Sequence, residues 1–436
     1  MSKKVSIFWF RRDLRVDDNR GFFEALNSNN LVLPIFIFDS NILKELPSKD
    51  HRVEYIHNSV DSLHKNLQKF DSGLAMYHGD PYQIFQNLIK DFDITSIYVN
   101  SDYEPYAKKR DSQIQELLHQ HDIDFFSYKD QVIFEKDDIV KNDGTPYVVY
   151  TPYMKKWMAQ LNTKQDLKEC KPNPSNLIQL QNFPYLSLND INFTQSGISM
   201  PEFNIDSDLI NNYGEYRDFP GLSATSHVGT ALRFGVISIR KIVAKALLSS
   251  DKTYLKELIW RDFFMQILWH FPYTQHQSFK EKYDSIPWRD APNDLEKWKK
   301  GQTGYPIVDA GMRELNTTGY MHNRVRMITA SFLCKHLLID WREGEKYFAE
   351  KLYDYELASN VGNWQWVAGS GVDAAPYFRI FNPETQMKKF DPKGEYVKKW
   401  VPEYFGVGYV LPMVDHKFAR ERAIETYKTA LDNFEK

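Results

Sequence analysis

The residue types best suited to chemistry are concentrated between residues 340 and 383. The three tryptophans of this stretch, Trp341, Trp364 and Trp366, occur together with the acidic pair Asp354 and Glu356, with Asn360 and with Arg379. An indole ring is large, and its N–H group needs a hydrogen-bond partner when the ring is buried. Such rings beside carboxylates and an amide indicate a walled pocket for a flat, polarizable molecule. A helical core that is simply rich in tryptophan would have the same composition.

Composition limits the classes of protein to which the chain can belong. Its 436 residues exceed one ordinary core and predict two or three domains. The formal net charge is -3, so a DNA-binding surface would need Lys and Arg gathered on one face. The two cysteines, Cys170 and Cys334, are too few for a disulfide framework or a four-cysteine metal site. This low cysteine count favours a reducing cytoplasm, and we expect no metal. Charges interrupt every apolar run below the length of a membrane span, so we expect a protein that does not enter the membrane.

The first 130 residues alternate short β-rich runs with amphipathic runs. Strands are expected at Val5–Phe10, 31–38, 73–79, 96–100 and 124–129, and helices at 52–70, 81–92 and 106–121. This alternation predicts an α/β domain with a Rossmann-like, doubly wound parallel sheet. No G-x-G-x-x-G pattern follows the first strand, so we do not expect the usual mode of dinucleotide binding.

The rest of the chain changes character twice. Residues 171–201 are rich in Pro, Asn and Ser and indicate an irregular connector. Helical periodicity then dominates at 232–248, 254–270, 307–315, 323–338, 343–352 and His416–Phe434. We therefore predict an α/β domain over residues 1–130, a connector over 131–205 and an all-α domain over 206–436.

Long motifs extend over nearly the whole chain in one order. They read FWFRRDLRVDDN, YEPYAKKRD, YRDFPGLSATSHVGTALRFGVIS, KELIWRDFFMQILWHFP, TGYPIVDAGMREL and MHNRVRMITASFLCKHLLIDW, followed by the segment at 340–383. Together they resemble the photolyase/cryptochrome flavoproteins, and most closely the class I cyclobutane pyrimidine dimer (CPD) photolyases. The resemblance implies an N-terminal antenna domain and a helical C-terminal domain that binds FAD and damaged DNA.

The resemblance places the flavin phosphates at a turn formed by Thr225, Ser226, His227, Val228 and Gly229. Hydroxyls and free backbone N–H groups before a helix suit a pyrophosphate, although an ordinary helix N-cap has the same residue types. The family has Leu-Ser-Pro where this chain has Val-Gly-Thr, so the contacts at that point are expected to differ. Further flavin contacts are assigned to Tyr213, Tyr254 and Tyr355, with Tyr216 as an alternative to Tyr213.

Four residues are assigned to the flavin ring. Asn360 stands where photolyases have an asparagine beside the redox-active ring nitrogen, whereas plant cryptochromes have an acid there. A neutral amide both donates and accepts, so it suits more than one protonation state of the ring. Asp354 and Arg326 are expected to form a buried ion pair beside the flavin. Glu356 replaces the family's usual aspartate, which changes the reach of that carboxylate.

The resemblance also assigns an electron relay and a pocket for the damaged bases. The relay consists of three tryptophans, Trp288, Trp341 and Trp364, each of which is by itself equally suited to a core. The pocket combines aromatic walls with groups that bond pyrimidine edges, namely Glu257, Trp260, Asn323, Met327 and Trp366. Contacts to the DNA strand are assigned to Arg217, Arg324, Arg379 and Gln386.

These assignments predict light-driven repair of CPDs by a monomer that acts on UV-damaged DNA. In that reaction photoexcited reduced FAD passes an electron to the dimer, and Glu257 stabilises the radical anion. Glu104 matches an acid that binds an antenna chromophore, which would be methenyltetrahydrofolate or a deazaflavin.

Four other functions would require residues or segments that differ from those of this chain. A cryptochrome-type photoreceptor would carry an acid at position 360 or a long C-terminal tail. A (6-4) photolyase would have a histidine pair where His322 stands alone. A DASH-type member would have a NWAYVAG-like run in place of NWQWVAG. An electron-transfer or nucleotidyl-transfer protein would leave the helical half of the chain unexplained.

Overall fold

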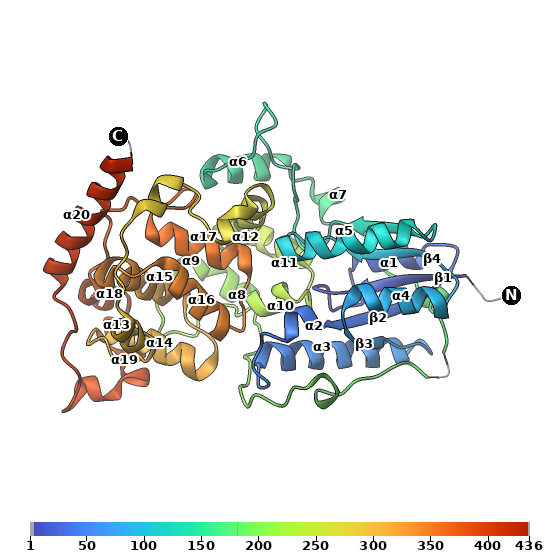
Figure 1. Cartoon of the computed structure of the whole chain (residues 1–436), viewed down its shortest axis with the longest axis horizontal. Coiled ribbons are helices and arrows are strands. Elements are labelled where there is room, and N and C mark those ends of the chain that lie inside the picture. The colour runs from blue at the N-terminus through green and yellow to red at the C-terminus, as the bar shows by residue number, and fades with distance from the viewer. Residues whose placement is uncertain (1–3, 181, 435–436) are drawn as a thin grey trace. The chain divides into compact units, whose positions relative to one another are not determined.

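The computed structural model describes residues 4–180 and 182–434, which form two compact units (Figure 1). Unit 1 comprises Met1–Asp138, Trp157–Phe203 and Val228–Leu248, and unit 2 comprises Ile139–Lys156, Asn204–His227 and Ser249–Lys436. The predicted domains were contiguous, whereas the two units interleave along the chain. No helix within the described residues is long and apolar enough to cross a membrane.

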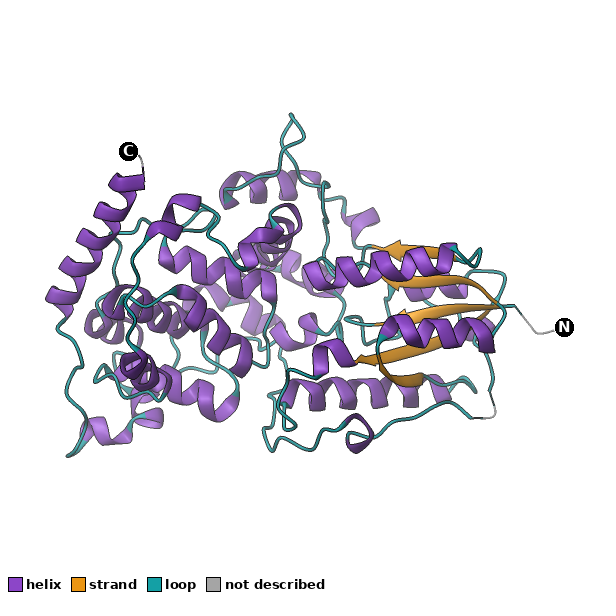
Figure 2. Cartoon of the chain, viewed as in Figure 1, coloured by secondary structure: helices purple, strands orange, loops and turns teal. Residues whose placement is uncertain are grey.

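Unit 1 is built on one parallel sheet, as the sequence predicted (Figure 2). Its strand order is β3-β2-β1-β4-β5, so the chain runs outward from β1 in both directions, which is the doubly wound arrangement. The strands are β1 (Val5–Phe10), β2 (Leu31–Asp39), β3 (Ala75–Gly79), β4 (Ile94–Asn100) and β5 (Asp124–Tyr128). The helices are α1 (Arg20–Leu26), α2 (Ser40–Leu43), α3 (His51–Gln68), α4 (Pro81–Asp91), α5 (Pro105–His119), α7 (Thr163–Asp166), α10 (Gly229–Arg233) and α11 (Ile239–Leu248).

Strand β1 shows why this sheet needs helices on both faces. All of its residues are buried, because side chains alternate between the faces and both faces are covered. Ile7 and Trp9 pack with Phe85 of α4 and with residues of α5. Phe8 and Phe10 pack with Phe22 of α1 and with residues of α3. A nearly continuous apolar run is therefore the expected sequence of this strand, and its one polar side chain, Ser6, is hydrogen-bonded to Ser96 at 2.9 Å.

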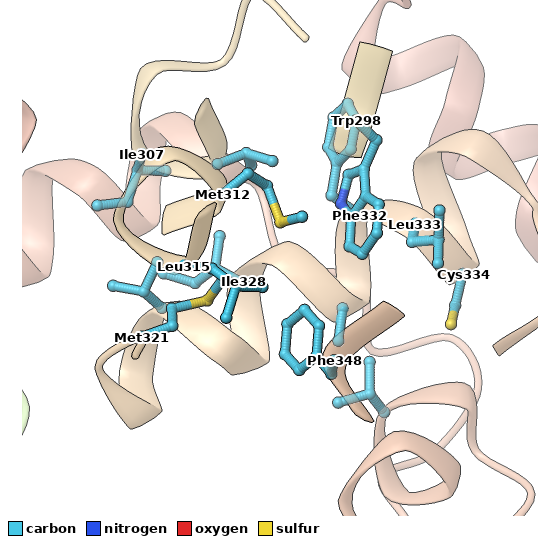
Figure 3. Close-up of a cluster of buried hydrophobic side chains, with 14 of the residues drawn as sticks. Trp298, Ile307, Met312, Leu315, Met321, Ile328, Phe332, Leu333, Cys334 and Phe348 are labelled. Atoms are coloured by element: carbon cyan, nitrogen blue, oxygen red, sulfur yellow. The ribbon is translucent and has the colours of Figure 1, made fainter. Parts of the chain in front are cut away.

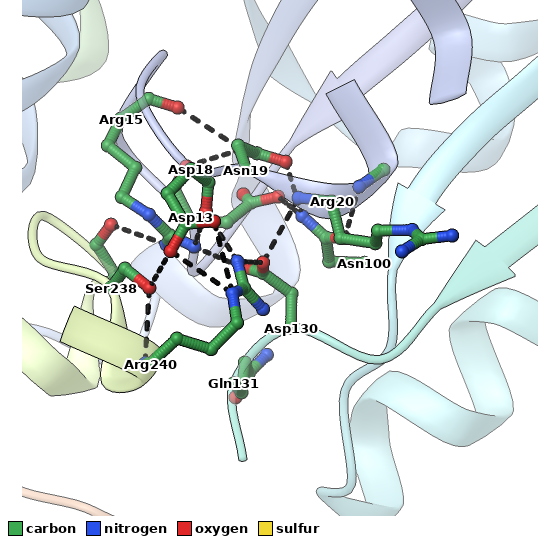
Figure 4. Close-up of polar contacts among 12 residues, drawn as sticks. Asp13, Arg15, Asp18, Asn19, Arg20, Asn100, Asp130, Gln131, Ser238 and Arg240 are labelled. Carbon is green, nitrogen blue, oxygen red and sulfur yellow. Dashed lines mark hydrogen bonds and ion pairs between the residues drawn. The ribbon is translucent and has the colours of Figure 1, made fainter. Parts of the chain in front are cut away.

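Buried charges fasten the loop after β1 to the rest of unit 1 (Figure 4). Arg15 and Arg240 both bind Asp130, at 2.6 and 2.8 Å, and Arg240 also binds Asp18 at 3.1 Å. All four side chains are at most 9% exposed. Desolvation raises the pKa of the neighbouring Asp13, whereas the two arginines hold the pKa of Asp130 below its usual value against the same burial effect. Removing one member would leave a buried charge without its partner, so the charged residues of the FWFRRDLRVDDN motif have a structural role.

Unit 2 consists of helices, in agreement with the predicted all-α region. They are α8 (Ser207–Asn211), α9 (Tyr213–Tyr216), α12 (Thr253–His270), α13 (Pro292–Lys299), α14 (Pro306–Thr318), α15 (Asn323–Ser331), α16 (Trp341–Lys351), α17 (Leu357–Ala368), α18 (Pro383–Phe390), α19 (Glu395–Trp400) and α20 (His416–Phe434). Helix α6 (Tyr150–Gln160) begins in unit 2 and ends in unit 1. Figure 3 shows the core, where Trp298, Phe332 and Phe348 pack among aliphatic side chains of α14 and α15.

Two predicted helices are interrupted. The helix expected at 232–248 ends at Arg233 and resumes at Ile239, because Gly235 has a φ of 65° and a Cβ there would lie 2.2 Å from the Arg12 carbonyl. The helix expected at 323–338 becomes a π-helix over Phe332–Leu337, and Leu338 then adopts a left-handed conformation. Apolar periodicity does not reveal either change, since both depend on backbone geometry.

Candidate functional site

A set of tyrosines surrounds the first part of the predicted phosphate turn in unit 2. Tyr254 donates a hydrogen bond to Ser226 at 3.0 Å, and its ring meets that of Tyr213 edge-on at 5.0 Å. Thr225 lies 3.4 Å from the hydroxyl of Tyr320. Tyr213 is thus placed beside the turn, whereas the alternative residue Tyr216 is exposed. Val228 and Gly229, the last residues of the turn, belong to unit 1.

His227 ends the unit 2 part of the turn in a strained backbone conformation, with a φ of 51°. Its ring packs against Tyr320 at 4.7 Å, and Tyr320 in turn stacks on Tyr353. Burial lowers the pKa of His227, so its ring is expected to be neutral at pH 7. The Nδ1 atom of His227 and the hydroxyl of Tyr353 are buried without a partner among the described residues. Such atoms are the ones that a bound polar ligand would satisfy.

The predicted ion pair between Arg326 and Asp354 is present next to these rings. The guanidinium binds both carboxylate oxygens, at 2.9 and 3.1 Å, and its Nε donates to the Met321 carbonyl at 2.7 Å. Burial alone would lower the pKa of Arg326, but the Asp354 charge outweighs it and raises that pKa above its usual value. Arg326 also lies 5.4 Å from the centre of the Tyr320 ring.

Asn360 is held by an acid that the sequence did not point out. Its amide nitrogen donates to the Glu345 carboxylate at 2.9 Å and to the Glu345 carbonyl at 3.1 Å. These two bonds fix the orientation of the amide. Burial raises the pKa of Glu345, even though hydrogen bonds from Asn360 and Tyr355 act in the opposite direction. Glu356 lies one turn before Asn360 and is paired with Arg261 at 3.5 Å.

Helix α12 carries two of the residues assigned to the lesion pocket. Glu257 forms an ion pair with Arg217, which belongs to the segment after α9. One turn later, the Trp260 ring is stacked on Tyr150 with 3.6 Å between ring centres and 6° between planes. Trp260 is half-buried, so part of the ring remains accessible. Tyr150 was not among the residues that the sequence pointed out.

The other residues assigned to DNA and lesion lie on α15, α17 and beyond. Arg324 binds Asp218 at 2.7 Å and lies 3.7 Å from the Met327 sulfur, so these three form one group. His322 caps α15 by accepting from the Arg324 N–H, and burial lowers its pKa to about 4, which supports a structural role. The remaining residues are Asn323 and Arg379, which are exposed, and Gln386 and Trp366, which are half-buried.

The three tryptophans of the predicted relay differ in burial. Trp364 and Trp341 are 2% and 1% exposed, whereas Trp288 is only partly buried and meets Tyr427 edge-on. Trp341 begins α16, and three residues later that helix passes so close to Trp364 that a Cβ on Gly344 would lie 2.1 Å from the indole. A fourth indole, Trp298, contacts Trp364 edge-on at 6.3 Å. Trp288 is thus the most accessible of the three indoles, and the relay itself stays a prediction.

Comparison with known proteins identifies the family. The family model for DNA photolyase matches residues 6–174, and the model for the FAD binding domain of DNA photolyase matches residues 254–408. The deoxyribodipyrimidine photo-lyase of Agrobacterium fabrum is 36% identical to this chain over 98% of each sequence. The chain belongs to the DNA photolyase family. The photolyase FAD-binding domain contains Arg326, Asp354 and Asn360, so FAD is its cofactor and the family resemblance is confirmed.

Solved structures of photolyase relatives confirm the fold. A bacterial class III photolyase from Agrobacterium tumefaciens has a TM-score of 0.89 at 34% identity, covering 99% of this chain and 98% of that chain. A cryptochrome from Synechocystis has a TM-score of 0.86 at 26% identity, covering 98% of this chain and 99% of that chain. Since the matches include a class III photolyase and a cryptochrome, placement in class I stays a prediction.

Proposed function

We propose that this photolyase-family protein repairs CPDs in UV-damaged DNA under light. The proposal is supported most directly by Asn360, whose amide is oriented by its hydrogen bonds to Glu345. A photoreceptor of the plant cryptochrome type would have an acid at this position. When it is bound and reduced, FAD supplies the light-driven electron that splits the cyclobutane ring.

The residues of unit 2 suit a flavin dinucleotide. The unpartnered His227 Nδ1 and Tyr353 hydroxyl offer polar contacts, and the Ser226 and Thr225 hydroxyls offer more. We infer that Tyr213, Tyr254 and the turn residues hold the phosphate and ribose groups. Arg326, Asp354, Tyr355, Glu356 and Asn360 are proposed to hold the ring.

On the DNA side, the proposal assigns separate tasks to charged and aromatic groups. Glu257 would bond a pyrimidine edge, and its ion pair with Arg217 orients the carboxylate. Trp260 and Trp366 would hold the flipped bases against aromatic faces and exclude water. Arg324 and Arg379 would contact phosphates and position the strand.

The antenna assignment is affected by the contacts of Glu104. Its carboxylate binds Arg12 at 3.0 Å and Arg233 at 3.1 Å within unit 1. A chromophore that uses this acid would have to compete with two arginines or share them. We propose Glu104 as an antenna contact only together with these arginines, for either methenyltetrahydrofolate or a deazaflavin.

The purified protein is expected to contain one non-covalent FAD per chain and to remove CPDs from DNA only under blue or near-UV light. The reason is that the splitting electron comes from an excited state that does not form in darkness. The measurement is a count of CPDs in irradiated DNA before and after illumination. Equal repair in the dark, or protein that stays free of flavin in excess FAD, would contradict the proposal.

Asn360→Asp should shift the absorption of the illuminated protein toward the protonated form of the half-reduced ring. The new carboxyl group would lie against Glu345, and two neighbouring carboxylates raise each other's pKa, so one of them keeps a proton to share. Asn363→Asp is the matched control, because Asn363 is exposed on the same helix. If both variants have the wild-type spectrum, Asn360 does not face the ring.

Trp260→Ala and Trp366→Ala should each weaken binding to CPD-containing DNA by about 1–3 kcal/mol, the range for losing an aromatic stacking surface. Undamaged DNA should bind nearly as before, since phosphate contacts supply that affinity. Arg379→Ala should instead weaken both complexes and flatten their salt dependence. Kd values for both DNAs at several salt concentrations distinguish the two patterns. If Trp260→Ala weakens binding to damaged and undamaged DNA equally, the assignment of Trp260 to the lesion pocket is wrong.

A further inference from the structure

Tyr150 stacks closely on Trp260, a contact that no sequence pattern indicates. The two rings are nearly parallel, with 6° between planes and 3.6 Å between centres. The Tyr150 hydroxyl donates to the Lys256 carbonyl at 2.7 Å, one helical turn before Trp260. Tyr150 therefore lies along α12 and covers one face of the indole.

Several contacts fix Tyr150 itself, so that it can serve as a rigid support. The ring is only 7% exposed and meets Phe263 edge-on at 5.9 Å. Its backbone N–H donates to Asp373 at 3.2 Å. Hydrogen bonds therefore hold both the hydroxyl and the backbone of Tyr150, and the ring between them has little conformational freedom.

Trp260 is held from its own helix as well. Phe264, four residues later, lies 5.3 Å away with 27° between the planes. Phe264 cannot move away, because a Cβ added to Gly362 of α17 would lie 2.3 Å from its ring. The half-buried indole is thus confined by Tyr150 and Phe264, and its plane is set before any DNA arrives.

Tyr150 also lies within reach of the charge on Glu257. Burial raises the pKa of the Tyr150 hydroxyl, and the Glu257 carboxylate raises it further. The phenol therefore stays protonated and keeps its bond to Lys256. Glu257 and Trp260 are three residues apart and occupy the same side of α12. Tyr150 therefore stacks on Trp260 and at the same time lies near the Glu257 carboxylate.

We propose that Tyr150 is a positioning residue for lesion recognition, which fixes the plane of Trp260 and thereby sets the preference for CPD-containing over undamaged DNA. This inference rests on the proposed function. A ring that is already oriented loses little conformational freedom when a base stacks on it, so its full contact energy contributes to binding. Undamaged DNA does not place a base there and gains nothing from the orientation.

The test compares Kd values for CPD-containing and undamaged DNA of the same sequence. Tyr150→Leu should weaken binding to the damaged DNA on the order of 3- to 10-fold, as expected for the loss of one aromatic pair. Binding to undamaged DNA should not change. Tyr150→Phe keeps the stack and should stay within about twofold of wild type, since only one hydrogen bond is lost. Tyr147→Leu is the matched control, because that half-buried ring faces Tyr153 and not Trp260.

A double variant separates positioning from general packing. In a Trp260→Ala background, Tyr150→Leu should cause no further loss, because the ring that it orients is gone. The inference is overturned if the Tyr150→Leu variant binds both DNAs as the wild type does, or if it binds both more weakly by the same factor. It is also overturned if Tyr150→Leu weakens binding to damaged DNA as much in the Trp260→Ala background as in the wild type. If Tyr150→Leu does not fold, Tyr150→Met carries the same expectations, since methionine fills irregular space. A wild-type protein without preference for damaged DNA would instead contradict the proposed function.

Discussion

Trp364→Phe is expected to slow the photoreduction of bound, oxidised FAD at least about tenfold, or about 1.4 kcal/mol in activation free energy. Repair by protein that has been chemically reduced beforehand should stay close to wild type. In the proposed function, the relay would supply electrons to the flavin, whereas the flavin itself would supply the electron to DNA. Phenylalanine retains most of the packing against Phe348, which meets the indole edge-on at 5.0 Å, but it is much harder to oxidise.

The structure offers a close control for this experiment. Trp298 is also fully buried, contacts Trp364 directly and donates its indole N–H to the Thr329 carbonyl. Because Trp298 is not one of the three relay residues, Trp298→Phe should leave photoreduction nearly unchanged. Photoreduction is followed from the loss of oxidised-flavin absorbance under illumination. If Trp364→Phe lowers both photoreduction and repair, or if Trp298→Phe has the same effect, the relay assignment fails.

Lys335→Met is expected to stabilise the protein, and to do so most at low pH. Lys335 is fully buried in the π-helix, where it donates to the Ala368 carbonyl at 2.9 Å and lies 3.7 Å from the centre of the Tyr427 ring. Burial lowers its pKa from 10.5 to about 7. Methionine has a similar length and carries no charge, so it should fill the same space without the desolvation penalty.

The sign of the pH dependence follows from the lowered pKa. Between about pH 7 and 10.5, Lys335 carries a proton in the unfolded chain but not in the folded chain. The free energy of unfolding of the wild-type protein therefore increases as the pH rises through this range, and the destabilising effect of Lys335 decreases. The increase in the free energy of unfolding caused by Lys335→Met should therefore be about 2–4 kcal/mol near pH 6 and should become smaller toward pH 10. Denaturant midpoints at several pH values measure it. Lys346→Met, at an exposed lysine of α16, should give no such trend, and a gain independent of pH would show that burial of the charge is not its source.

The fold followed from the sequence where burial determines the pattern. Strand β1 could be predicted because both of its faces are covered, which requires a nearly continuous apolar run. The break at Gly235 could not, because it depends on the approach of Arg12, a residue far away in the chain. The π-helix at Phe332–Leu337 was hidden for a related reason, since it changes hydrogen bonding and not apolar spacing.

In the candidate site, too, some features could be predicted from the sequence and others could not. The pairing of Arg326 with Asp354 was expected and is present, although the role of the pair is a proposal. Glu345 was missed because an acid on the amphipathic helix α16 reads as part of its solvent face. Tyr150 was missed because its partner lies on another helix, and a single aromatic residue in a loop-like sequence carries no periodic signal.

The buried charges of unit 1 have a consequence for the order in which the chain can mature during synthesis. Asp18 and Asp130 lie in the early part of the chain, but Arg240, which binds both, is translated long after β5. A nascent chain that ends before residue 228 would leave these two acids with only part of their countercharge in an otherwise finished sheet. The α/β unit therefore has to wait for residues 228–248 to leave the ribosome before Asp18 and Asp130 can pair with Arg240. By then the whole connector has already emerged.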